Sequence, residues 1–325
     1  MFTLRYTTNR CLLASLALLL CVVSRLSAAP PELKLDPALD YQAERTNAVK
    51  YQVEFSAMIT APYQTKLLRV WLPIPPSNFG QRMSASELTT FPQAVKPVLH
   101  VESQFGNQFA YFEFANPQGG QLIEHRFEIE VWELDWHLAL ETVSSVEAWP
   151  QSFEPYRRGE SQAVVVDDRF RQLLPQIVKQ RGNALGELDQ IMDWVNRKFI
   201  YDHADASLKA DATHGLLKQR GHCSDYHSFC ASLGRALGYP TRVTYGINPF
   251  PKQSPSHCKL ELFLPPHGWV SFDVSETQKL LKLIQQEPTL NDEQKTTLLN
   301  QAHDRLLHGF RDNTWFLQTV GTDYE

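Results

Sequence analysis

Apolar and polar residues alternate along the N-terminal third of the chain. Residues 51–59 read Tyr-Gln-Val-Glu-Phe-Ser-Ala-Met-Ile, and residues 127–131 read Phe-Glu-Ile-Glu-Val. This period of two predicts strands with one buried face. Segments 68–72 and 109–114 add two more strands, and the prolines at 73, 75 and 76 are expected to end the first of these, because proline cannot donate to a ladder. The region predicts a small antiparallel β-sandwich.

The period becomes helical beyond a predicted linker at about residues 149–159. Apolar residues at 170, 173, 174 and 177, and again at 188, 191, 195 and 199, form two stripes at helical spacing. A third helix is predicted to begin at or just before Cys223 and to end at Gly238, because Pro240 prevents its continuation. Strands are predicted at 241–245, about 257–263 and about 268–274, and the tail predicts a helix at 291–309 and a strand at 315–320.

The first residues have the order of an export signal. Arg5 and Arg10 precede an apolar run at 11–23, and the small residues Ser27, Ala28 and Ala29 follow it. This order is typical of a secretory signal, and the run is short for a membrane span, although an uncleaved N-terminal anchor is the alternative. We therefore expect an exported protein, periplasmic or secreted, with no stable membrane span after cleavage.

These patterns predict an α+β protein with four parts. The parts are a signal peptide at 1–29, a β-sandwich domain at 30–148, a helix-plus-antiparallel-sheet catalytic domain at 160–280, and a C-terminal helix and strand extension at 281–325. A chain of 325 residues is long enough for two sizeable cores.

The charge of the chain argues against nucleic acid as a partner. The formal net charge is −5, and residues 1–29 contain three arginines and no acidic residue, so their removal would change it to −8. A net-negative protein with no lysine- or arginine-rich run is a poor candidate for nucleic-acid binding.

The segment Gly221-His-Cys-Ser-Asp-Tyr226 carries the first sign of chemistry. Gly221 is expected to close a turn, which places Cys223 at the start of the third helix. Unpaired N–H groups and the positive end of the helix dipole favour a thiolate there, and a backbone N–H could also stabilise an oxyanion. Cys223 is therefore the candidate nucleophile.

A candidate base and its partner follow on two predicted strands. If Leu262 pairs with Gly268 around a five-residue loop, His257 lies directly opposite Asp273, where a carboxylate can hold the imidazole tautomer. In this register His257 and Lys259 share a polar face, and Cys258 points to the opposite face with the leucines.

The mature chain would hold three cysteines. Cys223 and Cys230 are about 10 Å apart along one helix, too far for a disulfide. Cys230–Cys258 is disfavoured if the Cys223 helix packs on the His257 face, because Cys258 then points away from it.

Together these residues resemble the transglutaminase-like superfamily, relatives of the papain-like cysteine proteases, over roughly 185 to 275. The resemblance rests on Gly-x-Cys-x-Asp-Tyr at 221–226, the segment Arg-Ala-Leu-Gly-Tyr-Pro-Thr-Arg at 235–242, His257 with Glu261, and Gly268-Trp-Val leading to Asp273. A departure is Cys258-Lys259, where the family often has a small residue and an aromatic.

The resemblance implies roles for individual residues. Cys223 would be the nucleophile, His257 the base and acid, and Asp273 the residue that orients the imidazole. Asp225, Tyr226 and Arg242 match positions that support the site, and Tyr201 is a candidate oxyanion-hole side chain. No cofactor is implied, and the sequence contains no calcium-loop pattern like that of the animal crosslinking enzymes.

The implied reaction is acyl transfer through a thioester on a peptide bond or glutamine amide. Water as acceptor gives hydrolysis, which we favour slightly, and an amine gives crosslinking; the expected partner is a peptide or protein substrate. Two alternatives remain open. One is a catalytically silent binding module of the same fold, and the other is a metal site, although the spacing of Cys223 and Cys230 is wide for zinc.

Overall fold

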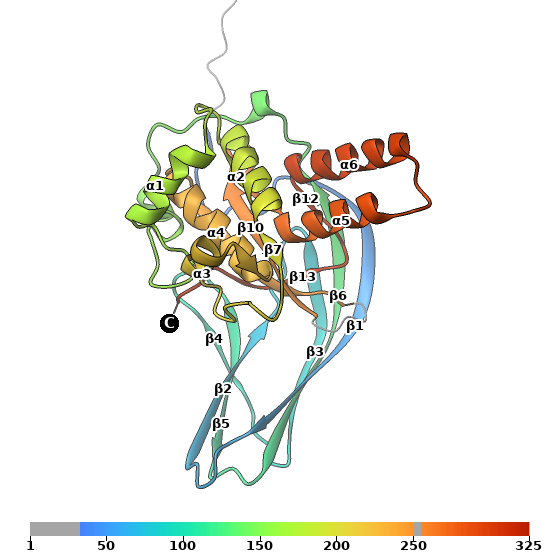
Figure 1. The fold of residues 1–325 in the computed structure, drawn as a ribbon. Coiled ribbons are helices and arrows are strands. Elements are labelled where there is room, and N and C mark those ends of the chain that lie inside the picture. Colours follow the sequence, from blue (N-terminus) through green and yellow to red (C-terminus); the bar gives the residue numbers. More distant parts are fainter. Residues whose placement is uncertain (1–32, 250–254, 325) are drawn as a thin grey trace, which may run out of the picture. The chain divides into compact units, whose positions relative to one another are not determined.

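The computed structural model describes residues 33–249 and 255–324. The predicted signal peptide at 1–29 lies outside the described residues. Leu33–Glu325 form one compact unit that contains α-helices and antiparallel sheets (Figure 1), and the predicted α+β class is confirmed.

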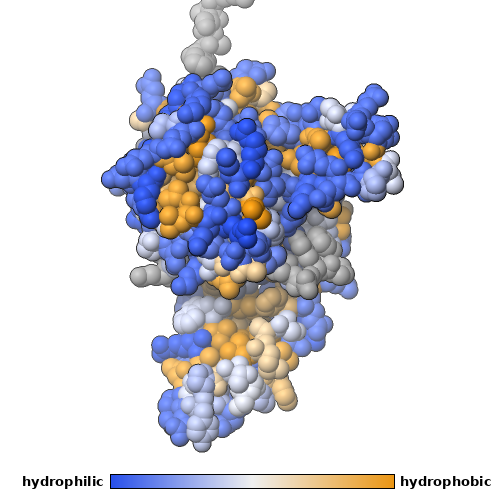
Figure 2. Space-filling view, in the orientation of Figure 1, coloured by the Kyte–Doolittle hydropathy of each residue, from blue (hydrophilic) through white to orange (hydrophobic). Residues whose placement is uncertain are grey.

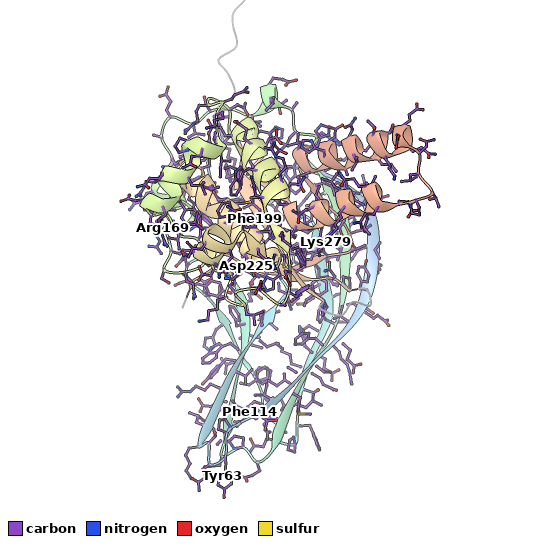
Figure 3. All side chains as sticks on the ribbon, in the orientation of Figure 1. Tyr63, Phe114, Arg169, Phe199, Asp225 and Lys279 are labelled. Carbon is purple, nitrogen blue, oxygen red and sulfur yellow. The ribbon has the colours of Figure 1, made fainter. Side chains whose placement is uncertain are left out.

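Two antiparallel sheets built from the first third of the unit face each other. In one sheet β6 pairs with β1 along one edge and with β3 along the other, where the C-terminal strand β12 (Phe310–Arg311) also joins it, and the second sheet has the order β2-β5-β4. Phe112 and Phe114 from β5 pack against Ile123 from β6, and Figure 3 shows Phe114 between the two sheets. The strands are β1 (Glu44–Thr60), β2 (Leu67–Ile74), β3 (Gln81–Phe91), β4 (Val98–Val101), β5 (Gln108–Ala115) and β6 (Gly120–Asp135).

The sequence interpretation of this region was incomplete. It missed β3 and β4, and it ended the second strand too early, since Pro73 pairs with Phe109 inside β2. β2 is an edge strand of its sheet, so an N–H can be absent there without breaking a ladder.

The second part of the unit packs helices against a four-stranded antiparallel sheet with the order β11-β10-β9-β13. Helix α4 contacts β9 and β10 and is surrounded by α1, α2, α3 and α5. The helices are α1 (Asp168–Ile177), α2 (Ala184–Lys198), α3 (Ala212–Lys218), α4 (Cys223–Ala236), α5 (Val274–Gln286) and α6 (Asp292–Leu307). The strands are β7 (Ile200–Tyr201), β8 (Arg220–Gly221), β9 (Thr241–Ile247), β10 (Ser256–Phe263), β11 (Trp269–Phe272), β12 (Phe310–Arg311) and β13 (Phe316–Val320).

The C-terminal segment joins both sets of strands. Helices α5 and α6 pack against each other and project from the helical layer (Figure 1). After α6, β12 pairs with β6 of the N-terminal sheet and β13 pairs with β9. The domain boundaries predicted from the sequence remain a prediction. The predicted C-terminal extension nevertheless pairs with a strand of the predicted sandwich domain through β12 and with a strand of the predicted catalytic domain through β13.

The surface differs between these parts. Figure 2 shows mainly hydrophilic residues over the helical layer, whereas apolar residues are exposed on the strands beneath it. Trp71 and Phe91 are among the exposed large apolar side chains of those strands. Within residues 33–249 and 255–324, no helix combines the length and apolarity needed to cross a bilayer.

Candidate active site

Cys223 is the first residue of α4, as the sequence predicts. The helix start is held by the buried Asp225 carboxylate, which accepts hydrogen bonds from the backbone N–H groups of His222 (3.1 Å) and Ser207 (3.3 Å). Gly221 has φ of +149°, and a Cβ there would lie 2.3 Å from Asp225 Oδ2. Glycine is required at this position because any side chain would displace the carboxylate that anchors the helix.

His257 and Asp273 lie within hydrogen-bonding distance. His257 Nε2 is 2.8 Å from Asp273 Oδ2, which leaves Nδ1 as the ring nitrogen available to the Cys223 sulfur. Cys223 and His257 line the same cavity and each shifts the pKa of the other, so the described structure brings all three predicted catalytic residues together.

A buried lysine completes the surroundings of the carboxylate. Lys259 Nζ donates to Asp273 Oδ2 at 2.7 Å and to Asp312 Oδ2 at 3.4 Å. Its side chain is 3% exposed, so its charge is compensated by these two carboxylates rather than by water. Lys259 and His257 thus share one oxygen of Asp273.

The surroundings of Cys223 and His257 favour the charged form of each side chain. A hydrogen bond from Cys258 and the neighbouring His257 hold the pKa of Cys223 well below its usual value, although burial opposes this. Burial also opposes the charge on His257, but Asp273 and then Cys223 raise the pKa of His257 to about 9. Asp273 is itself buried, yet the positive charges of His257 and Lys259 hold its pKa well below the usual range. These directions favour the thiolate of Cys223, the imidazolium of His257 and the carboxylate of Asp273.

The predicted strand register is wrong by two residues. Phe263 pairs with Trp269 and Leu262 with Val270, so β11 ends at Phe272 and Asp273 is not a strand residue. Asp273 is instead the N-cap of α5, where its Oδ1 accepts a hydrogen bond from the backbone N–H of Glu276 at 3.1 Å. From this N-cap position the carboxylate still reaches His257, with Oδ2 2.8 Å from Nε2.

The predicted packing of the two β10 faces is also wrong. Helix α4 packs on the face that carries Cys258, where His227 Nδ1 is 3.3 Å from Cys258 Sγ. The face predicted to be polar is buried as well, since His257, Lys259 and Glu261 are at most 4% exposed. The face argument against a Cys230–Cys258 disulfide therefore fails, although Cys223, Cys230 and Cys258 are all free thiols.

Two of the predicted supporting residues anchor the surroundings of the site. The hydroxyl of the buried Tyr226 donates to Gln278 on α5 at 2.8 Å, which ties α4 to α5. Arg242 Nε donates to the buried Glu261 carboxylate at 2.7 Å, and its guanidinium lies 3.9 Å from the centre of the Trp269 ring. Both positions connect the elements that carry Cys223, His257 and Asp273.

A cavity of about 900 Å³ opens at Cys223. Tyr201 lines it together with Cys223, and Tyr201 remains a prediction for the oxyanion-hole side chain. Lys279 also lines the cavity and lies 3.8 Å from the centre of the Tyr201 ring. Figure 3 places Lys279 and Asp225 on the helical side of the unit, away from Tyr63 at the far end of the strands.

Sequence reasoning missed three groups around the triad: His227, Asp312 and the hydrogen-bonding role of Cys258. His227 lies four residues after Cys223, which places it on nearly the same side of α4 and could have suggested its position. Asp312 comes from a distant segment, and no local pattern marks it. In the described part of the chain, no group of three or more histidine, cysteine, aspartate or glutamate side chains is arranged to hold a metal ion.

Comparison with known proteins supports the fold. Residues 171–274 match the family model described as the transglutaminase-like superfamily, and this range contains Cys223, His257 and Asp273. A solved structure from Cytophaga hutchinsonii, named only as a candidate cysteine protease, is 16% identical with a TM-score of 0.62 and covers 86% of this chain and 83% of its own. This likeness shows the fold.

Two further proteins show weaker structural similarity or a shorter match. The periplasmic domain of TgpA from Pseudomonas aeruginosa is 16% identical, with a TM-score of 0.41 and 80% of each chain covered. An uncharacterized protein from Haemophilus influenzae is 24% identical over 144 residues, which are 36% of this chain and 38% of that protein. The match thus spans well under half the length of that relative.

Proposed function

Because residues 171–274 form a transglutaminase-like core, we propose that this protein is a cysteine-dependent acyl-transfer enzyme that acts on peptide or glutamine amide bonds. The observation that carries the proposal is the contact of Cys223 with His257 and the 2.8 Å hydrogen bond between His257 Nε2 and Asp273 Oδ2. A nucleophile, a base and an orienting group in this order are the requirements of thioester chemistry.

The proposed reaction begins with attack of the Cys223 thiolate on the amide carbonyl carbon. A carbon–sulfur bond forms, and the negative charge moves to the carbonyl oxygen, where the backbone N–H of Cys223 and the Tyr201 hydroxyl are the candidate donors. The tetrahedral intermediate collapses, the carbon–nitrogen bond breaks, and the His257 imidazolium gives its proton to the leaving amine. A thioester and a neutral imidazole remain.

The second half of the reaction releases the acyl group. Neutral His257 removes a proton from water, the hydroxide adds to the thioester, and collapse restores the Cys223 thiolate and the imidazolium. An amine in place of water would give a new amide. We favour hydrolysis, because water is always present and an amine must be bound specifically; analysis of products from a peptide substrate with added amine would reverse this choice if the adduct predominated.

Asp273 supports these steps by holding the imidazole. Its Oδ2 accepts from His257 Nε2, so Nδ1 faces the sulfur throughout the cycle. Lys259 and the Glu276 backbone N–H fix the carboxylate in turn. We propose that the reaction needs no cofactor, because these side chains supply both proton transfer and nucleophile.

The test is labelling of Cys223 with a peptide electrophile. The wild-type chain should be labelled at Cys223 and not at the buried Cys230, whereas Cys223→Ala should lose the label and His257→Ala should slow it at least tenfold. Slow and equal labelling of Cys223, Cys230 and Cys258 would support the silent binding module instead. Iodoacetamide gives the same contrast without a substrate, since an activated thiol reacts below neutral pH.

We also propose that the protein is exported, to the periplasm or the medium, and that its partner is a peptide or protein. The support is the basic, apolar, small-residue order of residues 5–29 and the net negative charge, which disfavours nucleic acid. Fractionation of cells that express the full chain, with N-terminal sequencing of the product, tests both export and cleavage. Retention in the cytoplasm would contradict the proposal.

A further inference from the structure

Cys258 is a buried thiol beside the nucleophile that the proposed reaction does not use. It lines the same cavity as Cys223 and His257, and it is 1% exposed. Its thiol neighbours Cys223 in this cavity and lowers the pKa of Cys223, and its sulfur lies 3.3 Å from His227 Nδ1. Cys258 thus connects the nucleophile to a second histidine.

The hydrogen bonds of His227 fix its tautomer. The backbone N–H of Val274 donates to His227 Nε2 at 3.2 Å, so Nε2 is an acceptor and carries no proton. Burial lowers the pKa of His227 to about 4, although the Asp273 carboxylate opposes this, and the ring is neutral at neutral pH. A neutral ring with an acceptor at Nε2 carries its proton on Nδ1, which therefore donates to Cys258 Sγ.

The direction of the next hydrogen bond follows. Burial raises the pKa of Cys258 well above its usual value, and the neighbouring Cys223 adds to this, so Cys258 keeps its proton. Its sulfur accepts from His227, and its S–H is directed to the Cys223 sulfur. Cys230 lies on the same helix as His227, and burial raises its pKa too.

We propose that Cys258 is a hydrogen-bond donor to the Cys223 thiolate and that His227 is the positioning residue that directs this bond. The proposal rests on the proposed function, because it concerns the attacking form of Cys223. A thiolate that receives the Cys258 hydrogen bond in addition to that of His257 is favoured over its protonated form.

Other titratable and charged side chains surround the two thiols. Those that line the cavity or shift the pKa of a thiol are His222, Asp225 and His227 from α4, Tyr201 from β7, His203 and Lys209 from the segment before α3, Tyr245 from β9, His257 from β10, Asp273 at the start of α5, and Lys279 from α5. His257 also favours the Cys223 thiolate, so the removal of Cys258 costs one donor and leaves the imidazole.

The measurement is the rate of iodoacetamide alkylation at Cys223 between about pH 4 and pH 10, followed by peptide mapping of the full chain. The acid limb of the rate profile is the rise in rate as Cys223 loses its proton. In Cys258→Ala this limb should move to higher pH by about one unit, so that alkylation is about tenfold slower at pH values below the limb. Cys258→Ser keeps a hydroxyl donor and should recover part of the shift. Cys230→Ala is the matched control, because it removes a buried thiol seven residues further along α4, about 10 Å from Cys223, and its profile should coincide with that of the wild type.

His227 variants test the direction of the bond. His227→Asn can place an N–H near the position of Nδ1, whereas His227→Phe removes it, so the phenylalanine variant should show the larger upward shift. Thermal unfolding monitors the fold of each variant, and the Cys258→Ala and Cys258→Ser pair decides the question if a His227 variant does not fold.

The outcomes separate the two proposals. A wild-type chain that is unreactive below neutral pH would overturn the proposed function and this inference together. A reactive wild type whose acid limb coincides with that of Cys258→Ala would overturn only the inference, as would an equal shift in Cys230→Ala.

Discussion

Replacing Lys259 by methionine removes the buried cation that shares Asp273 Oδ2 with His257. The two nitrogens lie 2.7 and 2.8 Å from that oxygen, so their positive charges repel each other. Without Lys259 the carboxylate interacts with the imidazolium alone, and the pKa of His257 should rise above its present value of about 9. The alkaline limb of the Cys223 alkylation profile, which is the change of rate with pH that follows deprotonation of His257, should then move to higher pH.

The same substitution should destabilise the fold. Removing one partner of a buried ion pair costs about 3–5 kcal/mol, because a buried charge is left uncompensated. We expect about 3 kcal/mol, the lower end of that range. The reason is that Asp273 keeps His257 and the Asp312 side chain is 33% exposed. Urea unfolding measures this loss of free energy.

Lys50→Met is the matched control for the lysine substitution. Lys50 Nζ is 4.0 Å from Glu130, and its side chain is 78% exposed, so this pair should contribute less than about 1 kcal/mol. The reasoning about Lys259 is refuted if its variant unfolds like Lys50→Met, or if the alkaline limb moves to lower pH in a variant that remains folded.

The remaining predictions concern the same site. Asp273→Asn removes the charge that raises the pKa of His257, so the alkaline limb should move down from about 9 toward 6.5, the opposite of the Lys259 result. Burial opposes the charge of His257, but Asp273 and Cys223 raise its pKa to about 9. The imidazolium therefore stabilises the fold fully below pH 6.5, and this contribution is lost as pH rises through about 9. His257→Gln removes the titrating group, so the free energy of unfolding should fall less between pH 6 and pH 10 than it does in the wild type. Gly221→Ala should slow alkylation of Cys223 and lower stability by more than Gly238→Ala, since both glycines have positive φ but only the Gly221 Cβ would meet the Asp225 carboxylate; equal losses in stability would contradict this.

The sequence was sufficient to locate the helix that carries Cys223, the proposed nucleophile. Apolar spacing and the Gly238-x-Pro240 signal predicted a helix from Cys223, and α4 spans Cys223–Ala236. It was insufficient for α5, because residues 268–274 were interpreted as one strand. The signal for the helix was nevertheless present: Asp273 is followed by Glu276 three residues later, and this spacing of an N-cap residue and a glutamate is typical of a helix start.

Burial of the charged face of β10 could not be predicted from local pattern. His257, Lys259 and Glu261 alternate with apolar residues, which ordinarily indicates a solvent-facing side. Their partners come from remote segments: the Tyr41 hydroxyl donates to Glu261 at 2.8 Å, and Asp312 accepts from Lys259. A buried charge is tolerated only where such partners meet it, so the burial of this face depends on tertiary contacts that no periodicity reveals.

The contact between His257 and Asp273 was predicted from a register that the structure does not have. An odd shift would have reversed the faces of the strand residues. The actual shift is even, so the residues of β11 keep their face, and the strand ends before Asp273 rather than after it. As an N-cap, Asp273 is fixed by the backbone of α5 and not by a cross-strand neighbour. An error in strand register thus affects the prediction of a residue's pairing partner more than the prediction of its face. The position of the Asp273 carboxylate beside His257 depends on the start of α5 as much as on the sheet.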